Sequence, residues 1–430
     1  MRQIAAIIML CLLLALSGAV AGQDRATWRV ESVLALPLST GVGSARIFPS
    51  PDGRRVVHDS SIRLNGHIDR YLTLTLSEPG DEPRYFERPE DLPRGFEADP
   101  ASPHVPFRWS PDSARIAVAS QPFATLLDTD LWIFDLESEQ FTNLTDDGYT
   151  GPLTRQDGAT PAPGTTMELN PTWSPDGARI AVEQSVIGED GTFQPAEIVL
   201  IDSASGEAQP LLAVPGNGAA GATTSMDWSP DGATLALTVL HREADAENDG
   251  LWLVDTEAGE PRLLATLEQI DAAARSIFAD VSLTAIGPVM WSPDGTRLLL
   301  WAGDSGGTPA RVWPFVVDAG DGELTPVALP AHPNDTPERR ALRPLQAAWS
   351  PDGRSLLLFT FGLHPDEENT PLDPDNTSVR GAVRVIDVTS GEGQILGHLP
   401  LGKATPLYYA AWGPDGDVIV NSYHLKLAEE

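Results

Sequence analysis

The sequence is almost without cysteine, since Cys11 is the only one among 430 residues. A chain with a single cysteine forms no internal disulfide bond, and Cys11 lies in a segment that we expect to be removed. Disulfide-stabilised folds, cysteine metal ligands and cysteine nucleophiles are therefore excluded for the mature chain. Stability must come from apolar packing, for which a hydrophobic content of 41% over this length is sufficient.

Positive charge is also scarce. The chain has two lysines, Lys403 and Lys426, and its 28 Lys and Arg residues face 61 Asp and Glu, a net charge of −33. A field of this sign repels nucleic acids and anionic lipids, so we expect neither as a partner. The excess of acid favours a solvated surface that keeps the protein soluble, with binding of cations or of a basic partner as the alternative.

Long apolar runs are missing except for one, Ile4–Leu16. Arg2 before this run and Ala19-Val20-Ala21 after it make residues 1–21 resemble a secretory signal peptide. The run is shorter than the roughly 20 residues that span a bilayer. We expect cleavage, export to the periplasm or the extracellular space, and no membrane insertion afterwards; an uncleaved anchor is the alternative.

What the chain has in abundance is one repeated stretch, Trp173-Ser174-Pro175-Asp176-Gly177, which recurs with small changes seven times. Proline fixes the second position of a type I turn, aspartate suits the third, and glycine accepts the left-handed conformation at the fourth. Each copy therefore predicts a hairpin turn between two antiparallel strands. The prolines of the seven copies are Pro51, Pro111, Pro175, Pro230, Pro293, Pro351 and Pro414.

Strand patterns follow each turn. The apolar runs directly after the turns, which predict second strands, are 54–58, 115–119, 179–183, 234–239, 297–301, 355–360 and 417–421. Third strands that end in aspartate are predicted at 131–135, 197–202, 251–255, 312–318 and 383–387, and fourth strands at 262–267 and 394–399. Four short antiparallel strands per repeat make one blade of a β-propeller.

The two ends of the chain predict how the ring closes. Residues 28–38 offer strand material before the first copy, and the seventh copy lacks a full set of strands after it. Pairing of the N- and C-terminal strands completes the last blade and removes the open sheet edges. The sequence thus predicts an all-β, seven-bladed β-propeller of four-stranded antiparallel blades, with residues 22–430 as a single domain and a monomer.

The repeats resemble the TolB-type branch of WD40-like β-propellers, in which an Asp-Gly hairpin preceded by Trp-Ser-Pro recurs once per blade. The resemblance covers about residues 28–425. It departs locally at Pro49 in place of tryptophan, Ser113 in place of glycine and Gly413 in place of serine. Some related seven-bladed polysaccharide lyases hold a metal with histidines at the channel mouth. The eight histidines here show no HxH or HExxH spacing, so we expect no metal site.

The loops predict where a function would lie. The hairpin turns are short and fall on one face of the ring, whereas long irregular segments fall on the other. These long segments are 142–172, 241–250, 265–290, 328–348 and 361–381, with a helix predicted at 266–280. Long loops on a rigid scaffold are where binding usually occurs. We therefore predict a binding face, with tolerated surface insertions as the alternative.

Two of these loops hold the candidate binding residues. His241, Asp245 and Asp249 lie in the first, and the second contains His364, Asp373 and Asp375. Carboxylates at alternate positions can ligate calcium, but neither loop has the closing glutamate of a calcium loop. Solvated acidic loops are therefore favoured, and no cofactor is expected, with calcium as the alternative.

One string resembles a catalytic motif. Gly303-Asp304-Ser305-Gly306-Gly307 matches the G-x-S-x-G nucleophile elbow in letters, but that motif requires a strand-to-helix turn in an α/β sheet. Here it falls between two strands of the fifth repeat and is interpreted as a flexible loop, so no catalytic residue is predicted.

We therefore predict an exported, non-catalytic scaffold that binds a protein, peptide or glycan through its long-loop face. The alternative is an enzyme, a polysaccharide lyase or hydrolase, with its site at the central channel mouth. A third interpretation is the propeller half of a prolyl-oligopeptidase-like peptidase.

Overall fold

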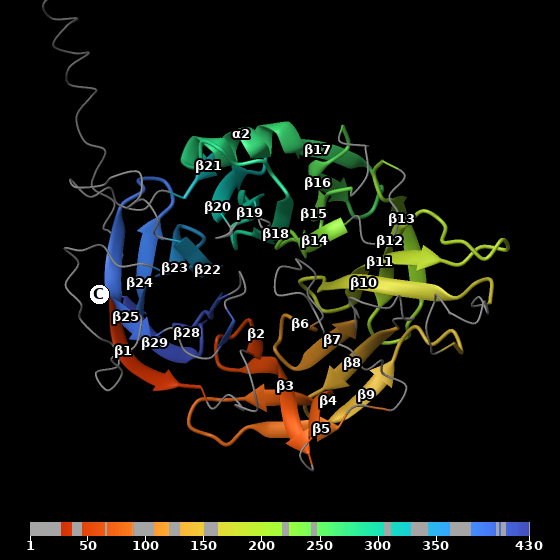
Figure 1. Ribbon diagram of the computed structural model, residues 1–430, viewed down its shortest axis with the longest axis horizontal. Coiled ribbons are helices and arrows are strands. Elements are labelled where there is room, and N and C mark those ends of the chain that lie inside the picture. Colours follow the sequence, from red (N-terminus) through yellow and green to blue (C-terminus); the bar gives the residue numbers. More distant parts are fainter. Residues whose placement is uncertain are drawn as a thin grey trace, which may run out of the picture.

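Seven β-sheets arranged around a central axis make up the protein (Figure 1). The computed structural model describes residues 27–36, 45–64, 67–87, 89, 107–119, 130–149, 162–216, 223–241, 247–304, 311–327, 343–361, 380–400, 404–405 and 410–429. The predicted seven-bladed β-propeller of four-stranded antiparallel blades is confirmed. The segment interpreted as a signal peptide lies outside the described residues.

Each blade runs from an inner strand at the axis to an outer strand at the rim (Figure 1). Blade 1 contains β2 (Ala45–Pro49), β3 (Val56–Leu64), β4 (His67–Ser77) and β5 (Arg84–Glu87). Blade 2 contains β6 (Phe107–Trp109), β7 (Arg115–Ala119), β8 (Leu131–Asp135) and β9 (Gln140–Asn143). Blade 3 contains β10 (Thr166–Trp173), β11 (Arg179–Val186), β12 (Glu197–Asp202) and β13 (Ala208–Ala213).

The remaining blades follow the same order. Blade 4 contains β14 (Thr223–Trp228), β15 (Thr234–Val239), β16 (Gly250–Asp255) and β17 (Pro261–Thr266). Blade 5 contains β18 (Ala285–Trp291), β19 (Arg297–Asp304), β20 (Arg311–Asp318) and β21 (Leu324–Pro326). Blade 6 contains β22 (Arg343–Trp349), β23 (Ser355–Phe361), β24 (Arg380–Asp387) and β25 (Gly393–Pro400). The second strands begin at the predicted residue in blades 2 to 7, and two residues later than predicted in blade 1.

Blade 7 closes the ring with strands from both ends of the chain. It contains β27 (Ala411–Trp412), β28 (Asp417–Val420), β29 (Tyr423–Glu429) and, as its outer strand, β1 (Trp28–Ala35). β1 pairs antiparallel with β29, from Trp28 opposite Glu429 to Ala35 opposite Tyr423. The predicted closure is therefore confirmed. A further two-residue strand, β26 (Ala404–Thr405), pairs in parallel with β2 at the inner edge of blade 1.

The motif turn is held by its serine and aspartate, as blade 3 shows. The hydroxyl of Ser174 donates to Asp176 at 2.6 Å and accepts from the backbone N–H of Arg179 at 2.9 Å. Asp176 also accepts from the backbone N–H of Ala178 at 3.0 Å. Gly177 has φ of +68°, a conformation in which a side chain is strained. The sequence motif is thus a self-contained hydrogen-bonded turn.

The motif tryptophans join consecutive blades. They are buried, as predicted. In five blades the indole N–H donates to a backbone carbonyl oxygen of the previous blade, which belongs to the residue just before that blade's own motif tryptophan or its replacement. The pairs are Trp109 with Phe48 (2.8 Å), Trp173 with Arg108 (3.0 Å), Trp228 with Thr172 (3.1 Å), Trp291 with Asp227 (3.2 Å) and Trp349 with Met290 (3.4 Å). Each tryptophan therefore fills the interface between two blades, which we call a seam, and satisfies its own polar group there.

The seam between blades 7 and 1 lacks this tryptophan, because Pro49 takes its place. The turns of the two blades approach so closely there that a Cβ at Gly413 would overlap the carbonyl oxygen of Asp52. A Cβ at Gly53 would likewise overlap the carbonyl oxygen of Asp417. The departure of the seventh copy from serine to glycine is thus required by the contact that closes the ring.

An ionic cluster supports the same seam. Asp417 accepts hydrogen bonds from Arg54 Nε of blade 1 at 3.0 Å, from Lys426 Nζ at 3.1 Å and from His424 Nε2 at 3.0 Å. Burial acts to raise the pKa of Asp417, but the hydrogen bonds from Arg54 and Lys426 outweigh it and hold this pKa below its ordinary value.

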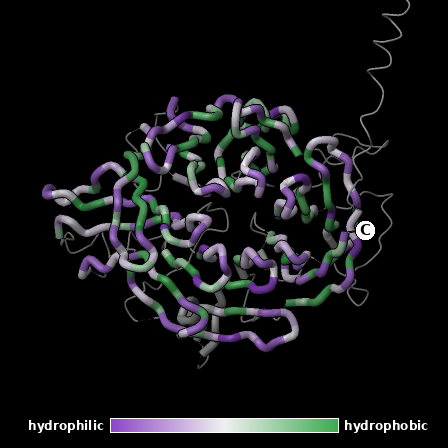
Figure 2. Tube along the Cα trace, turned by 180° about the vertical axis from the view of Figure 1, so that it is seen from behind, coloured by the Kyte–Doolittle hydropathy of each residue, from purple (hydrophilic) through white to green (hydrophobic). Residues whose placement is uncertain are grey.

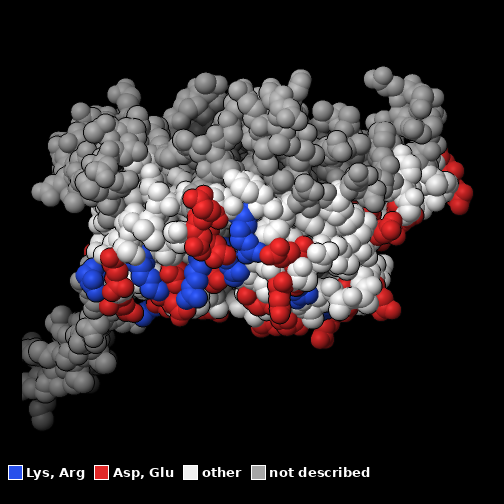
Figure 3. Space-filling view, turned by 90° about the horizontal axis from the view of Figure 1, so that it is seen from below, with Lys and Arg blue, Asp and Glu red and all other residues white. Residues whose placement is uncertain are grey.

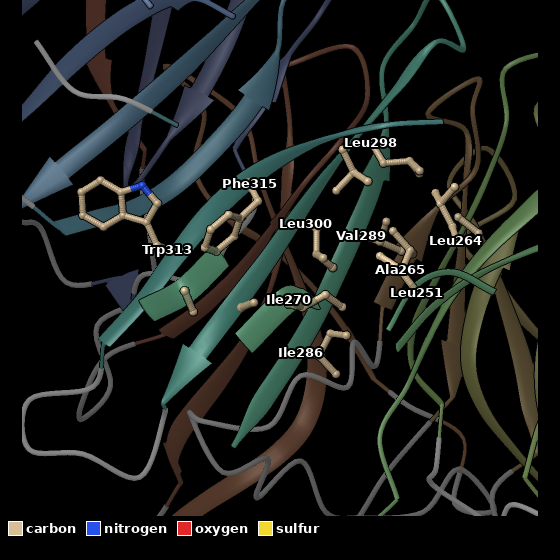
Figure 4. Packing of buried hydrophobic residues seen from close by; sticks show 14 of the residues in the cluster. Leu251, Leu264, Ala265, Ile270, Ile286, Val289, Leu298, Leu300, Trp313 and Phe315 are labelled. Atoms are coloured by element: carbon tan, nitrogen blue, oxygen red, sulfur yellow. The ribbon is translucent and has the colours of Figure 1, made fainter. Parts of the chain in front are cut away.

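A single helix, α2 (Leu267–Ile277), is described and confirms the helix predicted in the crossing from blade 4 to blade 5. It begins with a capping box, in which Thr266 accepts from the backbone of Gln269 and the Gln269 side chain accepts from the backbone of Thr266. Its buried residue Ile270 packs in one cluster with Leu300 and Trp313 of blade 5 (Figure 4). Hydrophobic stretches alternate with hydrophilic ones around the whole ring (Figure 2).

Candidate functional site

The two ends of the seams differ in what they bury. The ends near the motif turns hold the motif tryptophans and serines, and the carboxylates that they bury are paired: Asp417 with Arg54, Lys426 and His424, and Asp227 with the backbone N–H of Trp291. At the opposite ends of the seams between blades 2, 3 and 4, the buried side chains include carboxylates and a histidine. Burying such groups costs free energy unless they are paired, so their presence calls for a cause beyond packing.

The structure brings together two of the predicted binding residues, His241 and Asp249. His241 Nδ1 lies 2.5 Å from Asp249 Oδ1, which also accepts from the backbone N–H of His241 at 3.0 Å. Both side chains are almost completely buried, with 9% and 4% of their surface exposed. His241 Nε2 is buried with no hydrogen-bond partner, beside Gly216 of the crossing from blade 3 to blade 4. Asp249 therefore orients the ring and leaves Nε2 as the free polar atom.

Asp249 differs from the solvated acidic loop that the sequence favoured, because it lies in the interior as the partner of His241. The other predicted binding residues, which are Asp245, His364, Asp373 and Asp375, lie outside the described residues. Their placement stays a prediction.

The Gly303–Gly307 string begins at the end of β19, between two strands as expected, and residues 305–307 lie outside the described part.

A second polar cluster lies in the seam between blades 2 and 3. Asp130, directly before β8, is 5% exposed, and Glu168 in β10 is fully buried. Asn143 Nδ2 donates to Asp130 Oδ2 at 2.6 Å, Thr145 Oγ1 donates to Glu168 Oε2 at 3.1 Å, and Gln184 Nε2 donates to Glu168 Oε1 at 2.8 Å. Asp130 Oδ1 is buried without a hydrogen-bond partner. The cluster joins the end of blade 2 to the inner strand of blade 3.

Burial shifts the titration of both carboxyl groups. It raises the pKa of Glu168 to about 7, against the hydrogen bonds from Gln184, Thr166 and Thr145. It raises the pKa of Asp130 to about 6, against the hydrogen bond from Asn143 and with further repulsion from neighbouring carboxylates. Carboxyl groups that titrate near neutrality in a buried cluster are typical of functional sites.

Glu183 is a buried polar residue in the seam between blades 3 and 4. It is fully buried in β11, and its Oε2 accepts from the backbone N–H of Thr223 in β14 at 3.1 Å. The side chain of Asn170, with φ of +53°, donates to the carbonyl oxygen of Thr223 at 2.6 Å. Blade 3 is thus bounded by polar groups at the long-loop ends of both of its seams.

Sequence reasoning missed Asp130, Glu168 and Glu183. The signal that could have found two of them is a glutamate next to apolar residues of a strand, since Glu168 lies between Met167 and Leu169 and Glu183 follows Val182. Their partners lie far away along the chain, and only the blade geometry brings them together.

Charged side chains of the described residues gather toward one face of the ring (Figure 3). The short turns supply many of them, and a groove of 610 Å³ crosses that face between blades 3 and 4, with Arg179 and four carboxylates in its lining. The Ser174 hydroxyl lowers the pKa of Asp176, and backbone N–H groups lower that of Asp255. Asp176, Asp231 and Asp255 are engaged in their own turns, which assigns them to the scaffold.

In the described part of the chain, no group of three or more His, Cys, Asp or Glu residues is placed so that it could hold a metal ion. Within the same residues, no helix combines the length and the apolarity needed to cross a bilayer.

Comparison with known proteins gives distant similarity. No family model matches the chain. A stretch of 131 residues is 28% identical to a Bacillus subtilis (strain 168) protein described as uncharacterized peptidase YuxL. The match covers 30% of this chain and 16% of that protein, so this chain spans only a small part of that relative's length.

Solved structures with similar folds are more distant in sequence. An oligogalacturonate lyase in complex with manganese has a TM-score of 0.48 at 12% identity, covering 94% of this chain and 96% of that chain. TolB from Acinetobacter baumannii has a TM-score of 0.38 at 16% identity, covering 90% and 79%. The β-propeller domain of the trilobed protease from Pyrococcus furiosus has a TM-score of 0.43 at 14% identity, covering 87% and 90%. Similarity at this level says nothing about activity, and both enzymes and TolB occur among these proteins.

Proposed function

We propose that this protein is an exported, non-catalytic binding module that takes up a protein, peptide or glycan through the long-loop face of the propeller. The observation that supports the proposal is the set of buried polar groups at the long-loop ends of the seams around blade 3. Two of these groups, His241 Nε2 and Asp130 Oδ1, have hydrogen-bonding capacity that no partner uses.

The repeat does not require these groups. The seam between blades 4 and 5 is closed at its corresponding end by apolar side chains, among them Ile270 of α2 and Ile286. The long-loop end of a propeller seam can thus be closed by apolar side chains, and packing of this kind would avoid the desolvation cost. A ligand that forms hydrogen bonds with His241 Nε2 and Asp130 Oδ1 would account for the burial of these polar groups.

The test is retention of a macromolecule from the native envelope fraction by the exported protein. We expect the wild type to retain a defined protein or glycan, and the double variant His241→Gln/Asp249→Asn to bind it about tenfold more weakly or worse, as loss of one good polar contact implies. The matched control is Asp231→Asn, an exposed carboxylate in the blade 4 motif turn. Equal binding by wild type and double variant, or loss of binding in the control alone, would refute the proposal.

A second candidate function is an oligosaccharide lyase or hydrolase, favoured by the His241–Asp249 pair. A carboxylate that orients a histidine and leaves its Nε2 free is the arrangement of a general base. Turnover of an oligosaccharide by the wild type, abolished in His241→Gln, would establish this function in place of the binding module.

A further inference from the structure

We propose that Asp130 and Glu168 form a proton-binding site that fastens the segment 143–149 to blade 3 when both carboxyl groups are neutral and loosens it when they ionise. The segment connects the outer strand of blade 2 to the inner strand of blade 3, at the long-loop face. The inference rests on the proposed function in one respect: a proton bound here would regulate the face that we propose binds the partner.

The geometry makes the two carboxyl groups the anchor of the segment. Asn143 Nδ2 donates to Asp130 at 2.6 Å, and Thr145 Oγ1 donates to Glu168 at 3.1 Å. The backbone N–H of Thr145 donates to Asn143 Oδ1 at 3.1 Å, which links the two contacts. Thr145 Oγ1 also accepts from the backbone N–H of Leu131 at 2.8 Å. One short stretch therefore holds both acids.

The same stretch is joined to β10 further along. Asp147 Oδ2 accepts from the backbone N–H of Thr166 at 2.7 Å, and Tyr149 packs against the buried pair Met167 and Leu169. Loss of the anchor at Asp130 and Glu168 would leave these peripheral contacts to hold the segment.

The charges that raise the pKa values of the two groups are those of other carboxylates. Asp146 and Asp147 of the segment repel the ionised form of Asp130, and Asp130 in turn repels that of Glu168. The side chain that β11 contributes, Gln184, is neutral. Binding of a proton to either carboxyl group relieves this repulsion.

The direction of the effect follows from burial. Both groups are harder to ionise in the folded protein, where the pKa of Asp130 is about 6 and that of Glu168 about 7, than in the unfolded chain. The folded segment thus binds more protons than the open one, and its closed state is most stable in acid. This stability is lost as the pH rises through the two folded values. Asp130 Oδ1, which has no partner, adds to the cost of the ionised state.

The test is hydrogen exchange of the exported protein alone, measured by mass spectrometry and corrected for the intrinsic effect of pH. We expect amides of 143–149 to open at least about tenfold more at about pH 8 than at about pH 5, because the shifted titrations favour closure in acid. The double variant Asp130→Asn/Glu168→Gln should show the same opening at both pH values. The amides of α2, in the crossing after blade 4, serve as the internal control and should respond less.

Two results would overturn the inference: pH-independent opening of 143–149 in the wild type, or pH dependence that persists in the double variant. If the double variant fails to fold, Glu168→Gln alone replaces it, and the wild-type comparison still decides. Because this experiment contains no ligand, its outcome is separate from that of the binding test. If the protein retained no partner, the pH dependence of exchange could still be observed. If the pH dependence were missing, the binding proposal would still stand.

Discussion

Restoring the motif serine in the seventh blade should destabilise the protein. Substitutions toward the repeat consensus usually stabilise a fold, so Gly413→Ser would ordinarily be chosen to improve it. The structure predicts the opposite, because a Cβ at this position would overlap the carbonyl oxygen of Asp52 in blade 1. The contact is with backbone, which cannot rotate away as a flexible side chain would.

The magnitude follows from two opposing contributions. Overpacking that forces a backbone shift costs about 3 kcal/mol, near the upper end of its usual range. The hydroxyl would regain the motif hydrogen bonds, such as those that Ser350 makes with Asp352 at 2.6 Å and with the N–H of Ser355 at 2.9 Å, worth about 1 kcal/mol net. We therefore expect a net loss of about 2 kcal/mol in the free energy of unfolding.

Urea denaturation followed by circular dichroism measures the effect as a lower transition midpoint at unchanged slope. The matched control is the reverse exchange in blade 6, Ser350→Gly, which should also destabilise, by about 1 kcal/mol, because it removes hydrogen bonds without relieving a contact. A Gly413→Ser protein as stable as the wild type, or more stable, would refute the account of how the ring closes.

Three further predictions concern single side chains. Trp228→Phe should lower the free energy of unfolding by about 1 kcal/mol more than Trp412→Phe, because the first indole N–H is hydrogen-bonded and the second is buried without a partner; equal losses in urea denaturation would contradict the seam bonds. Thr266→Ala should cost about 1 kcal/mol by removing the capping box with Gln269, and hydrogen exchange should show the first turn of α2 opening more often; unchanged exchange there would count against the cap. Asp417→Asn should cost about 2 kcal/mol near neutral pH, since it removes the charge that three basic side chains share. The lowered pKa of Asp417 means that this contribution is present above its ordinary pKa and is lost as the pH falls, so wild type and variant should converge in acid, and a constant difference down to low pH would contradict it.

Much of the fold could be predicted from the sequence because the information is local. The turn and the two residues after it, 174–179, contain the groups of the hydrogen-bond network within the motif, so seven copies locate seven hairpins. The second strands that follow are apolar on both faces, since blades cover both sides of them. The helix was predictable at Leu267–Ile277 because its apolar spacing and its cap at Thr266 are written within one stretch.

The candidate site was only partly predictable. His241 and Asp249 were predicted as binding residues and lie eight residues apart in one loop, yet the position of His241 beside Gly216 of the crossing from blade 3 has no local signal. Asp130 and Glu168 lie close together because blades 2 and 3 pack against each other at their seam, and no spacing in the sequence predicts this contact. Buried acids inside strands are visible in a sequence, but their partners are not.

The most direct test of the central claim is a footprint of the bound partner. Hydrogen exchange of the protein should be compared with and without the macromolecule that it retains from the envelope fraction. The account predicts protection at 144–149 and 247–250, beside the two polar clusters, and no change in the motif turns 174–178 and 229–233. Protection centred on those turns, with 144–149 and 247–250 unaffected, would place the binding face on the opposite side of the ring and contradict the account.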